Sequence, residues 1–221
     1  STLQADSNNY IVSVMCGATA FGLSALDVST GEFSATELQR EKNLDSLKRE
    51  IERLAPAELL IAANSPDSDV SGAITEIFPD IKLSTVDVIF DHTYHARRLC
   101  DHFGVSSLRG FGIDDLPAAV LAASHLLDYV RDNLKTEPSH VKGISLYNPS
   151  EAMYLDATTR RNLELTATIR ENQKKGSLLW VLDRTCSPMG KRLIRRWIQN
   201  PLLDPAAINR RYAYTACRSF C

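Results

Sequence analysis

The sequence predicts a mixed α/β domain followed by an all-α region, and three observations support this division. The opening of the chain is rich in β-forming side chains, and strand-like and helical patterns then alternate. From residue 91 onward, apolar residues recur at helical spacing. The formal charge also changes: residues 1–156 carry 12 Lys and Arg against 23 Asp and Glu, whereas residues 157–221 carry 13 against 4. Two regions with different surfaces are therefore expected.

Three adjacent strands that form a meander are expected after a flexible, polar lead-in at residues 1–9. Residues 10–16 are rich in β-formers, and residues 21–27 follow as a second run of strand length. Residues 29–31 (Ser-Thr-Gly) supply a turn, after which residues 32–38 return as the third strand.

An amphipathic helix and a buried strand come next. Apolar residues at spacings of three and four between Leu44 and Leu54 share one helix face. Asn43 can cap the start of this helix, and Pro56 ends it. The apolar run at residues 58–62 has the length of a buried parallel strand. The remaining elements expected here are a turn at residues 65–67, a short helix over 70–78 and a weak strand over 81–83.

The pattern then becomes helical. Residues 91–103 predict a helix that is broken at Gly104, and residues 110–112 (Gly-Phe-Gly) predict a tight connection. A long apolar stripe between residues 116 and 134 predicts a second helix. The polar segment 135–140 is expected to act as a linker.

Capping residues divide the last third of the chain into helices. The expected elements are an extended segment at residues 144–147, helices over 156–172, 178–182 and 189–199, and a further helix that begins at Asp204-Pro205. Ser177 and Ser187 act as N-caps, and Pro188 occupies a first helical position. Leu193 and Trp197 lie four residues apart and are expected to face inward as core anchors.

Composition excludes several classes of protein. A hydrophobic content of 44% with 24% charged residues argues against wholesale disorder. No apolar run approaches the roughly 20 residues needed to cross a bilayer, and the start of the chain lacks a signal-peptide pattern. The five cysteines are odd in number and mostly far apart, which predicts a reducing, cytoplasmic location.

The motifs of common nucleotide and hydrolase sites are incomplete. The residue five before Gly190 is Thr185 rather than glycine, and Arg192 replaces the Ser or Thr that would hold magnesium in a phosphate loop. Gly110 and Gly112 lack the third glycine of a dinucleotide-binding turn. No G-x-S-x-G sequence is present. We therefore predict no catalytic residue and no cofactor site in this chain.

Two hypotheses that involve a metal ion can be drawn from small groups of residues: a histidine and cysteine site, and an acidic pair of a nuclease. The residues that could be combined into a metal site are His92, His95, Cys100 and His102. Since no second pair of ligands follows at matching spacing, surface or half-buried histidines are favoured, and no metal is predicted. Asp27 and Glu32 bracket a turn and could hold a divalent cation in a nuclease. An Asp followed by Ser-Thr-Gly is more often turn chemistry, so the nuclease stays an alternative.

A basic cluster lies on one predicted helix. Its members are Lys191, Arg192, Arg195 and Arg196, with Trp197 beside them. Such a helix suits contacts with nucleic-acid phosphates. A solvated face, or contacts with acidic surfaces elsewhere in a larger protein, is favoured over nucleic acid on general electrostatic grounds.

Several motifs keep a fixed order and spacing along the chain. In the last third they are residues 153–165 (MYLDATTRRNLEL), 176–185 (GSLLWVLDRT), 189–197 (MGKRLIRRW) and 200–204 (NPLLD). This series resembles the opening of the core domain in MutS-type DNA mismatch repair proteins. Upstream, residues 26–33, 56–60 and 103–112 resemble the hairpin, the buried strand and a later segment of the connector domain in that family. The resemblance covers about residues 8–211.

The resemblance implies an organisation into family domains. Residues 10–140 would form a connector domain with a ribonuclease H-like fold used without catalysis, and residues 141–211 would begin a helical core domain. Residues 212–221 do not continue the family pattern, and we expect them to form an atypical, disordered tail. The core helices in such a protein pack against later segments, so the faces near Leu193 and Trp197 would be exposed without them.

The resemblance also implies a function. The core helices would relay nucleotide state to DNA-clasping parts, and the connector would dock a MutL-like partner on the helix that carries Arg97 and Arg98. The parent would be a homodimeric, nucleoid-associated ATPase that uses ATP and magnesium and binds mismatched DNA. Its ATPase and clamp, and a mismatch-wedging domain with a Phe-x-Glu motif, are expected to lie outside these residues.

Overall fold

The structure is a computed structural model that describes residues 10–17, 19–40, 44–63, 68–134 and 138–216. The chain divides into two compact units between Tyr147 and Asn148. We refer to residues 10–147 as the sheet unit and to residues 148–216 as the helical unit. The predicted lead-in at residues 1–9, the cap at Asn43, the turn at residues 65–67 and the end of the tail at residues 217–221 lie outside the described residues.

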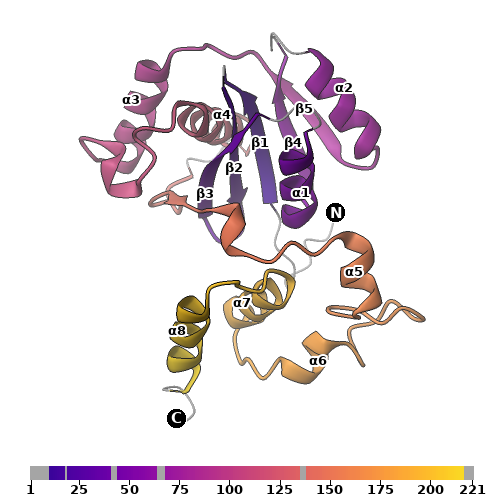
Figure 1. Cartoon of the computed structure of the whole chain (residues 1–221). Helices are drawn as coiled ribbons and strands as arrows, with labels where there is room; N and C mark the ends of the chain where they lie inside the picture. Colours follow the sequence, from indigo (N-terminus) through magenta and orange to yellow (C-terminus); the bar gives the residue numbers. More distant parts are fainter. Residues whose placement is uncertain (1–9, 18, 41–43, 64–67, 135–137, 217–221) are drawn as a thin grey trace. The chain divides into compact units, whose positions relative to one another are not determined.

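One mixed sheet forms the centre of the sheet unit, with the strand order β5-β4-β1-β2-β3-β6 (Figure 1). The strands are β1 (Tyr10–Cys16), β2 (Ala20–Asp27), β3 (Glu32–Gln39), β4 (Glu58–Ala62), β5 (Lys82–Val86) and β6 (Ser145–Leu146). β1, β2 and β3 pair antiparallel, β4 and β5 continue parallel to β1, and β6 is parallel to β3. The predicted meander and buried parallel strand are confirmed.

Helices cover both faces of this sheet. They are α1 (Asp45–Leu54), α2 (Ser68–Ile77), α3 (His92–Phe103), the short 3-10 helix η1 (Leu108–Phe111) and α4 (Pro117–Leu134). α1 and α2 share an apolar cluster with Val12 and Val14, whereas α3 and α4 share another with Leu26 and Phe33. Because side chains alternate along a strand, these two clusters lie on opposite faces of the sheet. The core therefore has two layers, one above and one below the strands.

α4 lies unusually close to the middle of the sheet at its first turn. A Cβ atom placed on Gly22 of β2 would stand 1.8 Å from the carbonyl oxygen of Ala118. Only a residue without a side chain permits this approach. Gly22 thus sets the position of the first turn of α4, which lines one of the hollows described below.

The helical unit contains short helices joined by turns. They are the 3-10 helix η2 (Pro149–Glu151) and the helices α5 (Ala157–Asn162), α6 (Leu178–Leu182), α7 (Pro188–Gln199) and α8 (Pro205–Ala216). The predicted N-caps at Ser177 and Ser187 are confirmed: the hydroxyl of Ser187 accepts a hydrogen bond from the Gly190 amide at 3.1 Å. An isolated antiparallel bridge joins Ala152 to Leu202, so the unit is not purely helical.

The helix predicted over residues 156–172 is wrong in its length, because α5 ends at Asn162. Glu164 adopts a positive φ of 47°, and its carboxylate accepts a hydrogen bond from the Ile169 amide at 2.7 Å. The backbone carbonyl of Glu164 accepts another from the Leu178 amide at the start of α6. A tertiary contact with α6 therefore replaces the helical continuation.

Three further expectations differ from the structure. The division between the units falls after Tyr147 rather than after residue 140, because β6 pairs with β3 and holds this segment on the sheet. Leu193 does not face inward as a core anchor, since 39% of its surface is exposed; this exposure agrees with the expectation that its face lies open without the later segments of a core domain. The disordered tail expected from residue 212 is wrong as far as Ala216, because α8 continues without a break past Arg211 to that residue. Among the described helices, none has the length and apolar character needed to cross a bilayer.

Candidate partner-binding surface

α3 is capped at both ends and carries the two arginines predicted to meet a partner. The Asp91 side chain caps its start by accepting a hydrogen bond from the Tyr94 amide at 3.1 Å. Gly104 ends it in the left-handed conformation with φ 66°. Leu99 is fully buried against α4. Arg97 is exposed on the outer side of this anchored helix.

Arg98 differs from Arg97 because it is tied to α4. Its guanidinium forms an ion pair with Asp128, which also receives a hydrogen bond from Arg131 at 3.2 Å. Arg98 donates a second hydrogen bond to the Tyr94 hydroxyl at 3.2 Å and lies 5.6 Å from the centre of that ring. The hydrogen bond to Asp128 raises the pKa of Arg98. With 37% of its side chain exposed, Arg98 both positions α3 and contributes to the surface.

Two buried histidines lie beneath this surface. The His95 and His125 ring centres are 4.6 Å apart. The Nε2 atom of His95 lies 2.6 Å from the Ile89 carbonyl, which can only accept, so Nε2 carries the proton. Nδ1 of His95 then accepts from the Ser124 hydroxyl at 2.9 Å. Burial lowers the pKa of both rings, that of His125 to about 4, so both are neutral at pH 7.

A polar hollow of about 520 Å³ opens beside these histidines. It is lined by Thr85, Val86, Asp87, Ile89, Tyr94, His95, His125, Asp128, Tyr129, Asp132 and Asn133. Nε2 of His125 is buried and has no hydrogen-bond partner among the described residues. The hollow therefore has the polar groups of a binding pocket next to Arg98.

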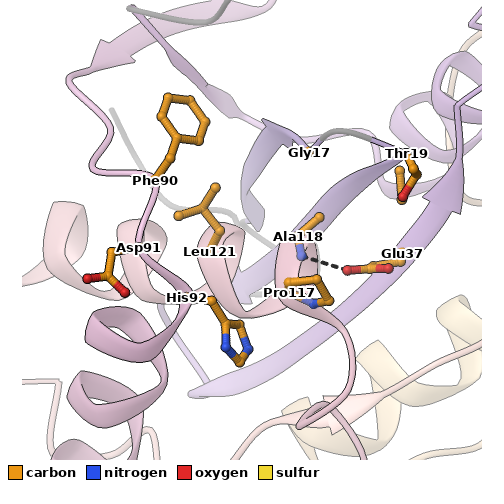
Figure 2. A pocket seen from close by; sticks show the side chains of 10 residues that line it. Gly17, Thr19, Glu37, Phe90, Asp91, His92, Pro117, Ala118 and Leu121 are labelled. Carbon is orange, nitrogen blue, oxygen red and sulfur yellow. Dashed lines mark hydrogen bonds between the residues drawn. The ribbon is translucent and has the colours of Figure 1, made fainter.

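A second, more apolar hollow of about 270 Å³ lies beside residues 90–92 (Figure 2). It is lined by Gly17, Thr19, Ala20, Glu37, Phe90, Asp91, His92, Pro117, Ala118 and Leu121. The Glu37 carboxylate accepts hydrogen bonds from the Ala118 and Ala119 amides at 2.6 and 3.2 Å. Because carboxylates already satisfy the amides at the starts of α3 and α4, this hollow suits an apolar group better than an anion.

Large apolar side chains that line the two hollows are exposed. Ile89 is 59% exposed, Phe90 52% and Tyr94 42%. We define the α3 docking surface as Ile89, Phe90, Tyr94, Arg97 and Arg98. The sequence analysis predicted the two arginines for this surface and did not point to the apolar residues. Ile89 and Phe90 form an apolar pair directly before the N-cap of α3, and that pair was the available signal.

The acidic pair considered for a nuclease is engaged in a turn. Asp27 Oδ1 accepts hydrogen bonds from the Ser29 amide at 2.9 Å and the Ser29 hydroxyl at 2.6 Å. Asp27 pairs opposite Glu32 in the β2–β3 register, so the two residues close the hairpin. These hydrogen bonds are the turn chemistry that the sequence analysis favoured over a nuclease site. No observation favours the nuclease alternative.

The histidines considered for a metal site are directed elsewhere. His95 is bonded to Ile89 and Ser124, and His102 Nε2 lies 3.1 Å from the Val141 carbonyl. Within the part of the chain that the structure describes, no three His, Cys, Asp or Glu side chains gather as metal ligands.

The structure brings the predicted basic cluster together on one helix. Lys191, Arg192, Arg195 and Arg196 all lie on α7. Trp197 of the same helix contacts Arg211 of α8, whose guanidinium carbon lies 4.8 Å from the centre of the indole. This surface belongs to the helical unit, whereas the α3 docking surface belongs to the sheet unit.

Comparisons with known proteins cover almost all of this chain. A family model described as MutS domain II matches residues 9–142, and one described as MutS domain III matches residues 158–218. A DNA mismatch repair protein MutS from Symbiobacterium thermophilum is 39% identical over 207 residues, which are 93% of this chain and 23% of that protein. The MutS of Microcystis aeruginosa is 38% identical over 218 residues, covering 95% and 24%. The chain spans about a quarter of the length of these relatives.

Proposed function

The chain belongs to the MutS family of DNA mismatch repair proteins, and on this premise we propose that it is a non-catalytic part of a mismatch sensor that docks a MutL-like partner through the α3 docking surface. The observation that carries this proposal is the exposure of Ile89, Phe90 and Tyr94 beside Arg97 on an anchored helix. Exposed apolar and aromatic groups beside arginine are typical of the residues that dominate binding energy at interfaces.

The contacts that anchor α3 support the same proposal. The Arg98–Asp128 ion pair and the buried Leu99 hold α3 against α4, so its outer side chains lose little freedom on binding. The two hollows flank the exposed segment and offer one apolar and one polar pocket to the same partner. A partner that places an apolar side chain over Leu121 and polar groups near Asp132 would match both.

A second proposal concerns the fold of each unit, and it goes beyond the mixed sheet with flanking helices that the structure shows. We propose that the sheet unit is a ribonuclease H-like connector, since an antiparallel meander of β1, β2 and β3 continues into parallel β4 and β5. β1 (Tyr10–Cys16) carries no acidic residue, which supports use of that fold without catalysis. The helical unit would be the start of an all-α core domain that relays conformational change between DNA-binding and ATPase parts.

Membership of the MutS family also supports proposals about a longer protein of which this chain would be a part. We propose a cytoplasmic, nucleoid-associated homodimer that binds mismatched DNA and uses ATP and magnesium in its ATPase. In the residues of this chain we assign no position to those cofactors.

Titration with a bacterial MutL tests the docking proposal. The chain is labelled and its fluorescence anisotropy is followed as MutL is added. Arg97→Glu and Phe90→Ala should each weaken binding by about tenfold or more, because they remove central contacts. The matched control is Arg49→Glu, which makes the same charge reversal on α1 at the opposite face of the sheet. No binding by the unaltered chain at high micromolar MutL, or equal losses in Arg97→Glu and Arg49→Glu, would contradict the proposal.

A further inference from the structure

The polar hollow beside the histidine pair is lined by several elements of the sheet unit. His125, Asp128, Tyr129 and Asp132 come from α4, where spacings of three and four place them on one helix face. The end of β5, the connection that follows it and the first turn of α3 supply the remaining walls. Because α4 and α3 pack together in one apolar cluster, the core fixes the positions of these walls.

The hollow carries negative charge that the described residues do not neutralise. Asp87, Asp128 and Asp132 line it, and the lining includes no Lys or Arg. Asp128 is paired with Arg98. Asp87 and Asp132 are exposed, and neither carboxylate forms an ion pair or a hydrogen bond with another residue that the structure describes. Two such carboxylates attract a cation and repel an anion.

The end of α4 adds to this negative potential. Asp132 lies in the last turn of α4, which ends at Leu134. The carbonyl groups at the C-terminus of a helix carry partial negative charge, so a carboxylate is unfavourable there unless a cation lies close to it. The position of Asp132 therefore opposes helix stability in the free chain and favours the binding of a cation.

Arg98 shows, at the edge of this hollow, how such groups hold a guanidinium. Its guanidinium pairs with Asp128 and lies 5.6 Å from the centre of the Tyr94 ring. Tyr129 also lines the hollow, and its ring is fixed because its hydroxyl donates a hydrogen bond to a carboxylate on β4. A carboxylate and a tyrosine ring thus occur together a second time, as Asp132 and Tyr129.

A buried nitrogen in the wall of the hollow lacks a partner. Only 9% of the His125 surface is exposed, the residue lines the hollow, and its Nε2 atom has no hydrogen-bond partner among the described residues. Burial lowers the pKa of His125, so the ring is neutral at pH 7 and does not repel a cation. With the ring proton on Nδ1, Nε2 is an acceptor. A ligand that brings N–H donors would offset the cost of leaving this atom unsatisfied.

These groups favour one class of ligand over others. The groups that remain unused are acceptors, namely two carboxylates and a ring nitrogen. A guanidinium has five N–H donors and no acceptor, pairs with carboxylates as a fork and stacks on aromatic rings. A metal ion is not favoured, since no three His, Cys, Asp or Glu side chains gather as ligands within the described part of the chain. The hollow of about 520 Å³ also has room for the alkyl chain that carries a guanidinium.

We propose that the polar hollow of the sheet unit is a binding site for a guanidinium group, which Asp87 and Asp132 attract by charge and which stacks on the Tyr129 ring. A free guanidino compound and an arginine side chain of another protein present the same group. The site is independent of the function proposed above, because it requires no MutL-like protein and neither Phe90 nor Arg97 lines it.

Nuclear magnetic resonance titration of the full chain with N-ethylguanidinium chloride tests this proposal. The amide signals of the residues that line the hollow should shift, with a dissociation constant in the millimolar range because the ligand is so small. Asp87→Asn/Asp132→Asn should weaken binding about tenfold, since two exposed charge contacts are lost. The matched control is Asp80→Asn/Asp101→Asn, which removes the same charge from exposed positions of the same unit and should bind as the unaltered chain does.

Two further ligands define the specificity of the site. N-ethylurea has nearly the same shape without the charge, and ethylammonium has the charge without the fork, so each should bind about fivefold more weakly or less tightly still. The proposal is overturned if the signals around the hollow do not shift at high millimolar N-ethylguanidinium, if the two double variants lose affinity equally, or if either further ligand binds as well. Thermal unfolding excludes misfolding of the variants, and loss of the charge of Asp132 should not lower the unfolding temperature.

Two arginine-containing probes identify the source of the group. They are L-arginine and the capped peptide acetyl-Gly-Arg-Gly-amide, titrated in the same way. Tighter binding of the peptide would support the site and assign it to a protein side chain, whereas tighter binding of L-arginine would support the site and assign it to a free metabolite. Failure of both probes to shift the signals around the hollow would refute the proposal.

Discussion

The two units of this chain bury their apolar residues to very different extents. The sheet unit has two large clusters, with fully buried side chains such as Phe21, Leu59 and Leu99. In the helical unit, the buried apolar side chains among the described residues are Leu165 and Leu179. The most exposed of the large apolar residues there is Met189, at 75%. The sheet unit is therefore stabilised by its core, whereas the helical unit depends on caps, turns and local hydrogen bonds.

The largest expected effect tests the core of the sheet unit. Phe21→Ala should lower the free energy of unfolding by about 3–5 kcal/mol, because it leaves a cavity between the sheet and its helices. Met189→Ala in the helical unit should change it by less than about 0.5 kcal/mol, since that side chain is already in solvent. Urea denaturation followed by circular dichroism measures both values. Similar losses in the two variants would refute the contrast between the units.

An intermediate effect is expected on acidification, and it should be confined to the sheet unit. The folded pKa values of His95 and His125 lie below the ordinary value of 6.5, and that of His125 is about 4. The unfolded chain therefore binds more protons between pH 6.5 and 4, and stability falls as the pH is lowered through this window. The loss should reach about 2–3 kcal/mol.

Urea unfolding at a series of pH values, monitored by amide signals of α3 and α4, measures this loss. The groups that face the histidine pair are Tyr94 and Arg98 on α3 and Ser124 and Asp128 on α4. His125→Phe should flatten the dependence, whereas His92→Gln, at an exposed position, should leave it unchanged. A flat profile in the unaltered chain would show that the pair is not buried in solution.

The smallest effect concerns helix caps. Ser187→Ala should destabilise α7 by about 1 kcal/mol, because the Gly190 amide loses its acceptor. Amide hydrogen exchange should speed up about fivefold along α7. Asp91→Ala removes an equivalent cap from α3, but there the contacts of Leu99 and the Arg98–Asp128 ion pair remain, so exchange should change less. A larger change in α3 than in α7 would reverse the comparison.

Local signals were sufficient for most elements of this fold. Strand-forming runs at the start of the chain, the apolar spacing from Leu44 to Leu54, and the Ser187-Pro188 start of α7 all predict what the structure contains. They succeed because strand alternation, helix periodicity and N-caps act over a few residues. The family motifs likewise depend on residue order alone and agree with the matches to MutS domains II and III.

Contacts between distant residues decided the rest. α5 stops at Asn162 because the carbonyl of Glu164 meets the start of α6, and the first unit extends to Tyr147 because β6 pairs with β3. The sequence by itself determined where helices and strands begin and which family they belong to. Only tertiary structure decided that Ile89 and Phe90 are exposed beside Arg97, and that Arg211 meets Trp197. Burial and charge proximity depend on neighbours that are far away in the chain, and local patterns carry no information about them.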